Sequence, residues 1–159
     1  MKKVHYLSLL IAALLIFLCS CSSGDDKIGK NTARILVSYG SDNIEAYYHE
    51  LYAQTDGVAY DCAKPDIKEL FGSLPAFTIK KDGSRETRQI KVELEGKHGE
   101  ATYSIWNKDI KQTDIVKLQD NKIPIPSESG DYLFQLDVTW LGEGQNCTGV
   151  NYLFKITVE

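Results

Sequence analysis

Histidines are the first residues to consider for catalysis, because imidazole is the side chain that titrates nearest to neutral pH. The 159-residue chain has three of them, His5, His49 and His98. No Gly-x-Ser-x-Gly, His-Glu-x-x-His or phosphate-binding glycine motif accompanies them. A hydrolase that uses two carboxylates stays open as an alternative, since such acids converge only in space. We therefore predict no catalytic residue, no metal site and no cofactor, and we expect a protein that is not an enzyme.

Tyrosines are the second group that could do chemistry. Tyr47, Tyr48, Tyr52 and Tyr60 lie close together in the chain. Aromatic rings can stack on sugars or fill a pocket of a partner protein, so these four residues form a candidate binding surface. The alternative is that the rings pack over one end of the folded domain. His49 lies in the same stretch, and we expect it to be partly buried or at an interface.

The N-terminal residues predict where the protein is located. Two lysines precede an apolar run over 7–18, which is too short to span a bilayer as a helix. The motif Leu18-Cys19-Ser20-Cys21 follows and resembles the lipobox of bacterial lipoproteins. The resemblance implies that residues 1–20 are a signal peptide and that Cys21 receives lipid as the new N-terminus. A secretory peptide with an ordinary cleavage site and an uncleaved anchor are the alternatives.

A lipid on Cys21 would divide the rest of the chain into two parts. Residues 21–31 are small and polar, which predicts a flexible tether, and residues 32–159 would form one domain. The domain would lie on the extracytoplasmic side of the cell membrane, or of the outer membrane in a Gram-negative cell. Loss of two leader lysines changes the net charge from −4 to −6. This acidic balance argues against nucleic acid. The expected partners are the membrane, through the lipid, and an envelope protein or glycan.

Two cysteines remain in the predicted domain, Cys62 and Cys147. A disulfide is chemically permitted in an exported protein. It would close a loop of about 85 residues, for which the chain-entropy model gives about 4–5 kcal/mol. The alternative is two separate thiols that pack as small apolar groups. A zinc site is not expected, because no other cysteine or histidine lies near either residue in the sequence.

The pattern after the tether is typical of short strands separated by turns. Residues 44–53 have aromatic residues at helical and at extended spacing, and we favour an extended segment. Residues 66–71 can form a short helix that ends at Gly72. Asp82-Gly83 is a turn signal that predicts a hairpin between its two flanking strands. Strands are expected over 33–39, 77–80, 89–94, 101–106, 115–118, 130–140 and 152–158, with an edge or loop segment over 123–126.

The last two of these strands have the clearest pattern. Residues 130–140 read Gly-Asp-Tyr-x-Phe-x-Leu-x-Val-x-Trp, and residues 152–158 read Tyr-x-Phe-x-Ile-x-Val, so each strand has one apolar face. Together they resemble the final hairpin of bacterial immunoglobulin-like lipoprotein domains. The resemblance implies a mostly β fold, namely an antiparallel immunoglobulin-like β-sandwich with at most one or two short helices. The hairpin is also similar to secreted proteinase-inhibitor domains of bacilli, although no reactive-site segment can be assigned.

Function has to be argued separately from the fold, because one fold supports many functions. Our first hypothesis is a non-enzymatic, membrane-anchored lipoprotein that binds a protein or a glycan. An inhibitor or accessory subunit of an exported enzyme or transporter is the second hypothesis, and a hydrolase is the third.

Overall fold

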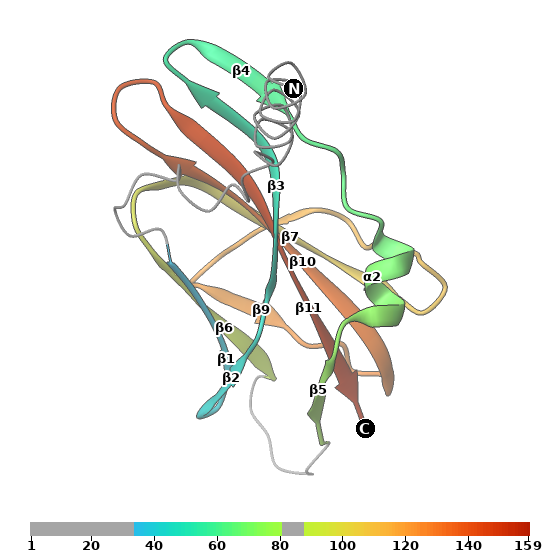
Figure 1. Ribbon diagram of the computed structural model, residues 1–159. Helices are drawn as coiled ribbons and strands as arrows, with labels where there is room; N and C mark the ends of the chain where they lie inside the picture. The colour runs from blue at the N-terminus through green and yellow to red at the C-terminus, as the bar shows by residue number, and fades with distance from the viewer. Residues whose placement is uncertain (1–33, 81–87) are drawn as a thin grey trace, which may run out of the picture. The chain divides into compact units, whose positions relative to one another are not determined.

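The computed structural model describes residues 34–80 and 88–159. Within these ranges the chain is mostly β-strand with one short helix, α2 (Figure 1). None of the described residues belongs to a helix long and apolar enough to cross a bilayer. The predicted signal peptide, the predicted lipidation site Cys21, the predicted tether and the Asp82-Gly83 turn signal lie outside the described residues. The elements are β1 Arg34–Tyr39, β2 Asp42–Ile44, β3 Tyr47–Thr55, β4 Val58–Asp61, α2 Ile67–Ser73, β5 Ala76–Ile79, β6 Gln89–Glu95, β7 His98–Asn107, β8 Val116–Lys117, β9 Lys122–Pro124, β10 Gly130–Leu141 and β11 Cys147–Val158.

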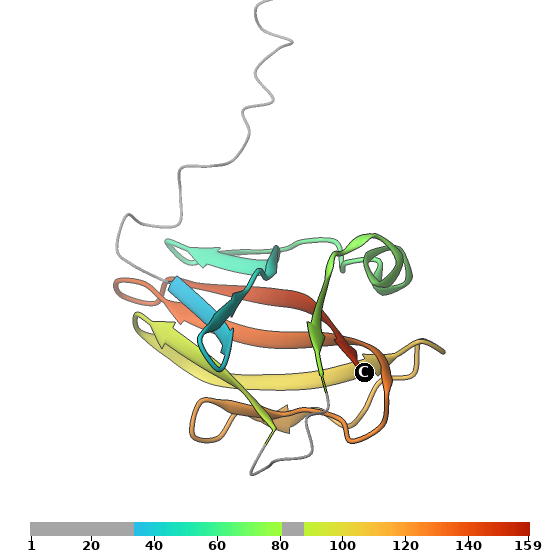
Figure 2. The same ribbon diagram turned by 90° about the horizontal axis from the view of Figure 1, so that it is seen from below.

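The strands form two sheets. The smaller sheet has the order β2-β1-β6-β9, and the larger has the order β4-β3-β11-β10-β7-β8 with β5 attached to β11. Figure 2 shows β3, β11, β10 and β7 side by side in the larger sheet. All strand pairs are antiparallel except β5 and β11, which are parallel. Because β10 occupies one edge of β11 throughout, β3 and β5 share the other edge, one at each half of the strand.

The main core takes buried apolar side chains from both sheets. Ile90 and Val92 of β6 belong to the same cluster as Phe134 of β10 and Phe154 of β11. The two phenylalanines are opposite one another in the ladder, and their rings stack with centroids 5.2 Å apart. Full burial of such a side chain contributes about 1.5–3 kcal/mol, so these two phenylalanines are a major source of stability.

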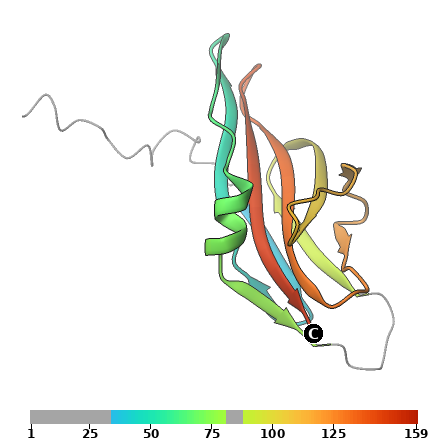
Figure 3. The same cartoon turned by 90° about the vertical axis from the view of Figure 1, so that its right-hand side faces the viewer.

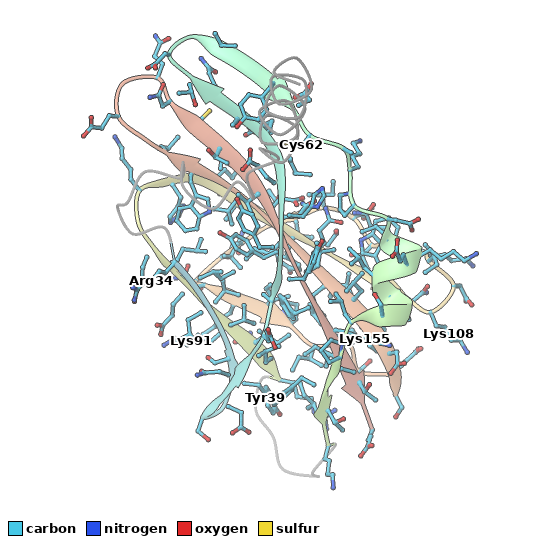
Figure 4. All side chains as sticks on the ribbon, viewed as in Figure 1. Arg34, Tyr39, Cys62, Lys91, Lys108 and Lys155 are labelled. Atoms are coloured by element: carbon cyan, nitrogen blue, oxygen red, sulfur yellow. The ribbon has the colours of Figure 1, made fainter. Side chains whose placement is uncertain are left out.

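The alternation predicted for the last two strands is confirmed. Phe134, Leu136, Val138 and Trp140 of β10 all lie in the core, as do Tyr152, Phe154, Ile156 and Val158 of β11. The opposite face is also covered in places, since Leu133 and Leu153 have no exposed surface. Lys155 on this face lies beside α2 (Figure 4), with its ammonium 5.0 Å from the centre of the Phe71 ring. The central strands are therefore buried on two sides at this end, which alternation alone did not indicate.

The extended segment favoured over residues 44–53 is confirmed by β3. The predicted hairpin between 77–80 and 89–94 is wrong, because β5 pairs with β11 whereas β6 pairs with β1 and β9. A turn signal acts locally, but β5 finds a longer-range partner in the free half-edge of β11, where Ile79 becomes buried.

The short helix is confirmed with shifted ends. Asp66 is its N-cap, and its carboxylate accepts a hydrogen bond of 3.0 Å from the backbone N–H of Glu69. Gly72 does not end the helix, which continues to Ser73 and stops before Pro75. His98 is the first residue of β7, and its ring meets the Trp140 ring edge to face at 5.8 Å.

Candidate functional site

The β3–β4 hairpin carries the four tyrosines predicted to form one surface, and the structure divides them between two faces. A β-bulge opposite Gly149 and Val150 leaves Leu51 as the extra residue of β3. Tyr48 pairs with Tyr152 and so faces the same side as the core, and Tyr60 lies on that side as well. Tyr47 and Tyr52 lie on the opposite face, as their register with Leu153 and Gly149 shows.

Tyr52 is held in place by contacts with β10 and β11. Its hydroxyl lies 2.7 Å from Oγ1 of Thr139, within hydrogen-bonding distance. Its ring stands directly over Gly149, where an added Cβ would lie only 2.1 Å from the ring. Tyr52 therefore fixes the hairpin to β10 and β11.

Tyr48 and Tyr60 gather around one carboxylate on the inner face. The Tyr60 hydroxyl donates to Oε1 of Glu50 at 3.1 Å, and the Tyr48 hydroxyl donates to Oε2 at 3.4 Å. The Cys62 thiol points to Oε1 at 3.8 Å. We call these four residues, Tyr48, Glu50, Tyr60 and Cys62, the Glu50 cluster. Cys62 lies just after the end of β4 (Figure 4).

The carboxylate of Glu50 contributes to a raised pKa in each of the three residues that contact it. The hydrogen bond to Glu50 raises the pKa of Tyr60. Burial raises the pKa of Tyr48 to about 12, with Glu50 as the next cause. Burial also raises the pKa of the Cys62 thiol, and Glu50 adds to that effect. Cys62 is therefore protonated at neutral pH, and a protonated thiol is a poor nucleophile.

The surface around the Glu50 cluster is uncovered. In Figures 1 and 3 the β3–β4 hairpin extends beyond the end of the smaller sheet. Tyr48 is 42 % exposed and Tyr60 is 52 % exposed, and every residue of β4 is exposed. These exposed rings are what a partner or a sugar could contact.

The remaining predicted residues do not converge. Nε2 of His49 lies 2.6 Å from the carbonyl oxygen of Ala63, whereas His98 lies three strands away on β7. Cys62 and Cys147 are free thiols in the structure, and β3 lies between β4 and the strand that carries Cys147. Within the described residues, the two histidines and the two thiols therefore do not form one group.

Glu50 lies at the centre of this surface but was not among the site residues predicted from the sequence. The signal was present, because Tyr48 and Glu50 are two residues apart, as are Tyr60 and Cys62. Residues at this spacing share one face of a strand. The two strands become neighbours through the Asp56-Gly57 turn, and only their register brings the two pairs together.

A second polar group was also missed, on the other face of the larger sheet. The indole N–H of Trp106 donates to Gln135 at 3.1 Å, and the amide groups of Gln135 and Asn151 donate to Asp137. Burial raises the pKa of Asp137. Among the described residues no buried side-chain N or O atom lacks a partner, so this network accounts for its own hydrogen bonds and is structural.

The surface also has two hollows. One of about 120 Å³ lies between Tyr47, Pro75 and Lys155, and one of about 360 Å³ is lined by residues that include Asn107, Lys111, Glu128 and Tyr132. The described part of the chain has no group of three or more side chains suited to hold a metal ion. Comparison of the chain with protein-family models, with curated proteins and with solved structures finds no match.

Proposed function

We propose that this protein is a lipid-anchored, extracytoplasmic binding domain that recognises an envelope protein or glycan through the exposed face of the β3–β4 hairpin. The observation that carries the proposal is the exposure of Tyr48 and Tyr60 around Glu50. Rings that are half exposed and held by a common carboxylate offer contact area with little loss of side-chain freedom on binding.

The strand order supports an immunoglobulin-like sandwich as the scaffold. In that fold, strands A, B and E lie in one sheet and strands C, F and G in the other. The order β1-β6-β9 corresponds to A-B-E, and the order β7-β10-β11 corresponds to C-F-G. On this interpretation β3, β4 and α2 form an insertion after the first strand, so the candidate surface is an addition to the scaffold.

The anchor rests on the lipobox resemblance of Leu18-Cys19-Ser20-Cys21. Cys21→Ala is expected to release the protein from the membrane fraction, because lipid attachment would have no acceptor. Mass spectrometry of the native protein should find acyl chains on Cys21 and no residues before it. An unmodified thiol at this position would contradict the anchor.

The surroundings of the Cys62 thiol support a non-enzymatic role. Cys62 has the Glu50 carboxylate beside its thiol, and a carboxylate raises the pKa of a thiol instead of lowering it. We therefore propose that Cys62 packs beside Glu50 as a member of the Glu50 cluster.

Binding through the hairpin can be tested with the full chain in detergent. Tyr48→Ala combined with Tyr60→Ala should reduce retention on isolated envelope fractions by about tenfold or more, the effect of losing central aromatic contacts. The matched control is Ile115→Ala with Val116→Ala, two exposed apolar residues at the opposite edge of the same sheet. Treating the fractions with protease or with glycosidases separates a protein ligand from a glycan. Equal retention of both double variants would overturn the proposal.

A further inference from the structure

The edge strand β4 has backbone N–H and C=O groups that bond to no other described strand. Cys62, which continues the strand, donates its N–H to the carbonyl of Leu51 on β3 at 2.7 Å. Bonded and non-bonded pairs alternate along an antiparallel ladder, so Tyr60 and Val58 also bond to β3. The N–H and C=O groups of Ala59 and Asp61 consequently point away from β3. Among the described strands β4 pairs with β3 alone, so these four groups face outward.

The other strands that end the two sheet orders carry features that discourage further pairing. β8 has two residues, and its Lys117 forms an ion pair of 2.9 Å with Glu100. β9 has three residues and contains Lys122 and Pro124, while β2 has three residues and begins with an aspartate. Short length, lysine and proline are the usual means of blocking a sheet edge. β4 has four residues, all exposed, with no proline and no lysine.

The acidic charges on and beside β4 determine which kind of strand can pair with it. Glu50, Asp56 and Asp61 are acidic, and the described hairpin from Tyr47 to Asp61 contains no lysine or arginine. A second copy of β4 in antiparallel pairing would bring two such acidic hairpins together, and like charges facing each other across strands are destabilising. The hairpin therefore disfavours its own copy and favours a basic segment.

The Glu50 cluster can accept a cation. Its carboxylate is contacted by two phenols and a thiol, none of which carries positive charge at neutral pH. Two strand spacings, about 10 Å, would separate β3 from a strand added to β4. The side chains of Glu50 and of a lysine or arginine can span this distance together. The Tyr48 and Tyr60 rings would lie beside the cation, an arrangement that favours ammonium and guanidinium groups.

We infer that the free edge of β4 pairs with an extended segment of a partner protein, and that a lysine or arginine of this segment binds at Glu50 between Tyr48 and Tyr60. This inference rests on the proposed function and names its ligand class. A sugar would use the rings but would leave the row of outward backbone groups at Ala59 and Asp61 unpaired, which is why the edge favours a polypeptide.

The test uses the full chain in detergent and a short probe peptide that alternates threonine and valine around one central lysine. Ala59→Pro removes one outward N–H without removing a bond to β3, since proline is tolerated where a strand N–H faces solvent. We expect this variant to bind the peptide at least about tenfold more weakly than the native chain, because strand addition depends on backbone bonds. Ala59→Ser keeps the N–H and is the matched control.

The charge is tested separately. Glu50→Gln keeps an oxygen that can accept from Tyr60 but removes the negative charge, and it should weaken binding of the lysine peptide about two- to fivefold, the range of an ion pair in contact with water. The same peptide with glutamate in place of lysine should bind more weakly to the native chain, and Glu50→Gln should strengthen its binding because the substitution removes a like charge. Equal binding of the two peptides to the native chain would overturn the cationic part of the inference.

Other outcomes separate this inference from the proposed function. If Ala59→Pro binds the peptide like the native chain while Tyr48→Ala with Tyr60→Ala does not, the edge pairing is overturned and the proposed function stands. Absence of peptide binding at millimolar concentration would overturn the inference, whereas retention on envelope fractions tests the proposed function independently. A concentration-dependent dimer in sedimentation that Ala59→Pro abolishes would assign the edge to a second copy and overturn the basic partner.

Discussion

Tyr152 and Tyr48 are direct neighbours in the ladder between β11 and β3, yet they lie in opposite environments. Tyr152 is 6 % exposed and its hydroxyl accepts a hydrogen bond of 2.8 Å from the indole N–H of Trp140. Tyr48 is 42 % exposed and its hydroxyl donates to Glu50. Their rings meet edge to face with centroids 6.0 Å apart. Within one pair of strands, the surface changes from core to candidate binding face.

The difference depends on the smaller sheet. Residues of β10 and β11 pack against Ile90, Val92 and the other apolar residues of that sheet, which excludes water from them. The β3–β4 hairpin continues the larger sheet past this cover. The hairpin thus has the residue types of a core, aromatic and β-branched, but exposes them on a surface. Clustered exposed apolar groups are typical of interaction sites, which is why the hairpin is the candidate surface.

The comparison predicts the largest difference between variants of the two parts of the sheet. Phe134→Ala should destabilise the fold by about 3–5 kcal/mol, because it leaves a cavity beside the Phe154 ring on which the Phe134 ring stacks. Tyr60→Ala should leave stability almost unchanged, since its ring is half exposed. Urea denaturation of both variants measures the two effects. A large loss for Tyr60→Ala would mean that the hairpin is part of the core.

Attachment of the hairpin to the sheet should show the next largest effect. Gly149→Ala places a methyl group against the Tyr52 ring and should destabilise by about 1–3 kcal/mol, the usual effect of overpacking. Tyr52→Ala in the same chain should recover part of this loss, as a double-mutant cycle would reveal. Gly99→Ala is the matched control, because its added Cβ would lie at an ordinary 3.7 Å from Thr139. Equal effects at the two glycines would show that Tyr52 does not fix the hairpin.

The fold could be predicted where burial follows local alternation. The apolar residues of 130–140 and 152–158 occur at every second position, and the structure places them in the core as this period requires. The partner of β5 could not be predicted in this way. Its parallel pairing with β11 depends on β3 leaving half of an edge free, and no residue near β5 in the sequence records that.

The candidate site could be predicted only in part, for a related reason. Four tyrosines in one stretch drew attention to the right hairpin, but sequence spacing did not reveal that a bulge at Leu51 sends Tyr52 to the opposite face from Tyr48. A bulge shifts the two-residue period by one, so residues before and after it exchange faces. Glu50 was overlooked because its partners on β4 become neighbours only through strand register.

Hydroxyl deletions sharpen the comparison of the two tyrosines themselves. Tyr152→Phe leaves the buried Trp140 N–H without its acceptor and should cost about 1–3 kcal/mol. Tyr48→Phe should change stability by less than about 0.5 kcal/mol, because its hydroxyl is in contact with solvent. Thermal and urea denaturation at neutral pH measure both. A similar cost for the two substitutions would contradict the difference in environment.

The smallest expected effect is a change in titration with little change in stability. Glu50→Gln should lower the pKa of Tyr60, whose increase comes first from its hydrogen bond to Glu50 and then from the charge of that carboxylate. The sign follows because a phenolate forms less readily beside a negative charge, and the substitution removes that charge. For Tyr48, whose pKa is about 12, burial is the first cause and is not removed by the substitution, so its pKa should stay above the ordinary value of 10.0. NMR of ring-labelled tyrosines against pH distinguishes the two residues. An unchanged pKa of Tyr60 would mean that the Glu50 carboxylate does not hold the exposed face together.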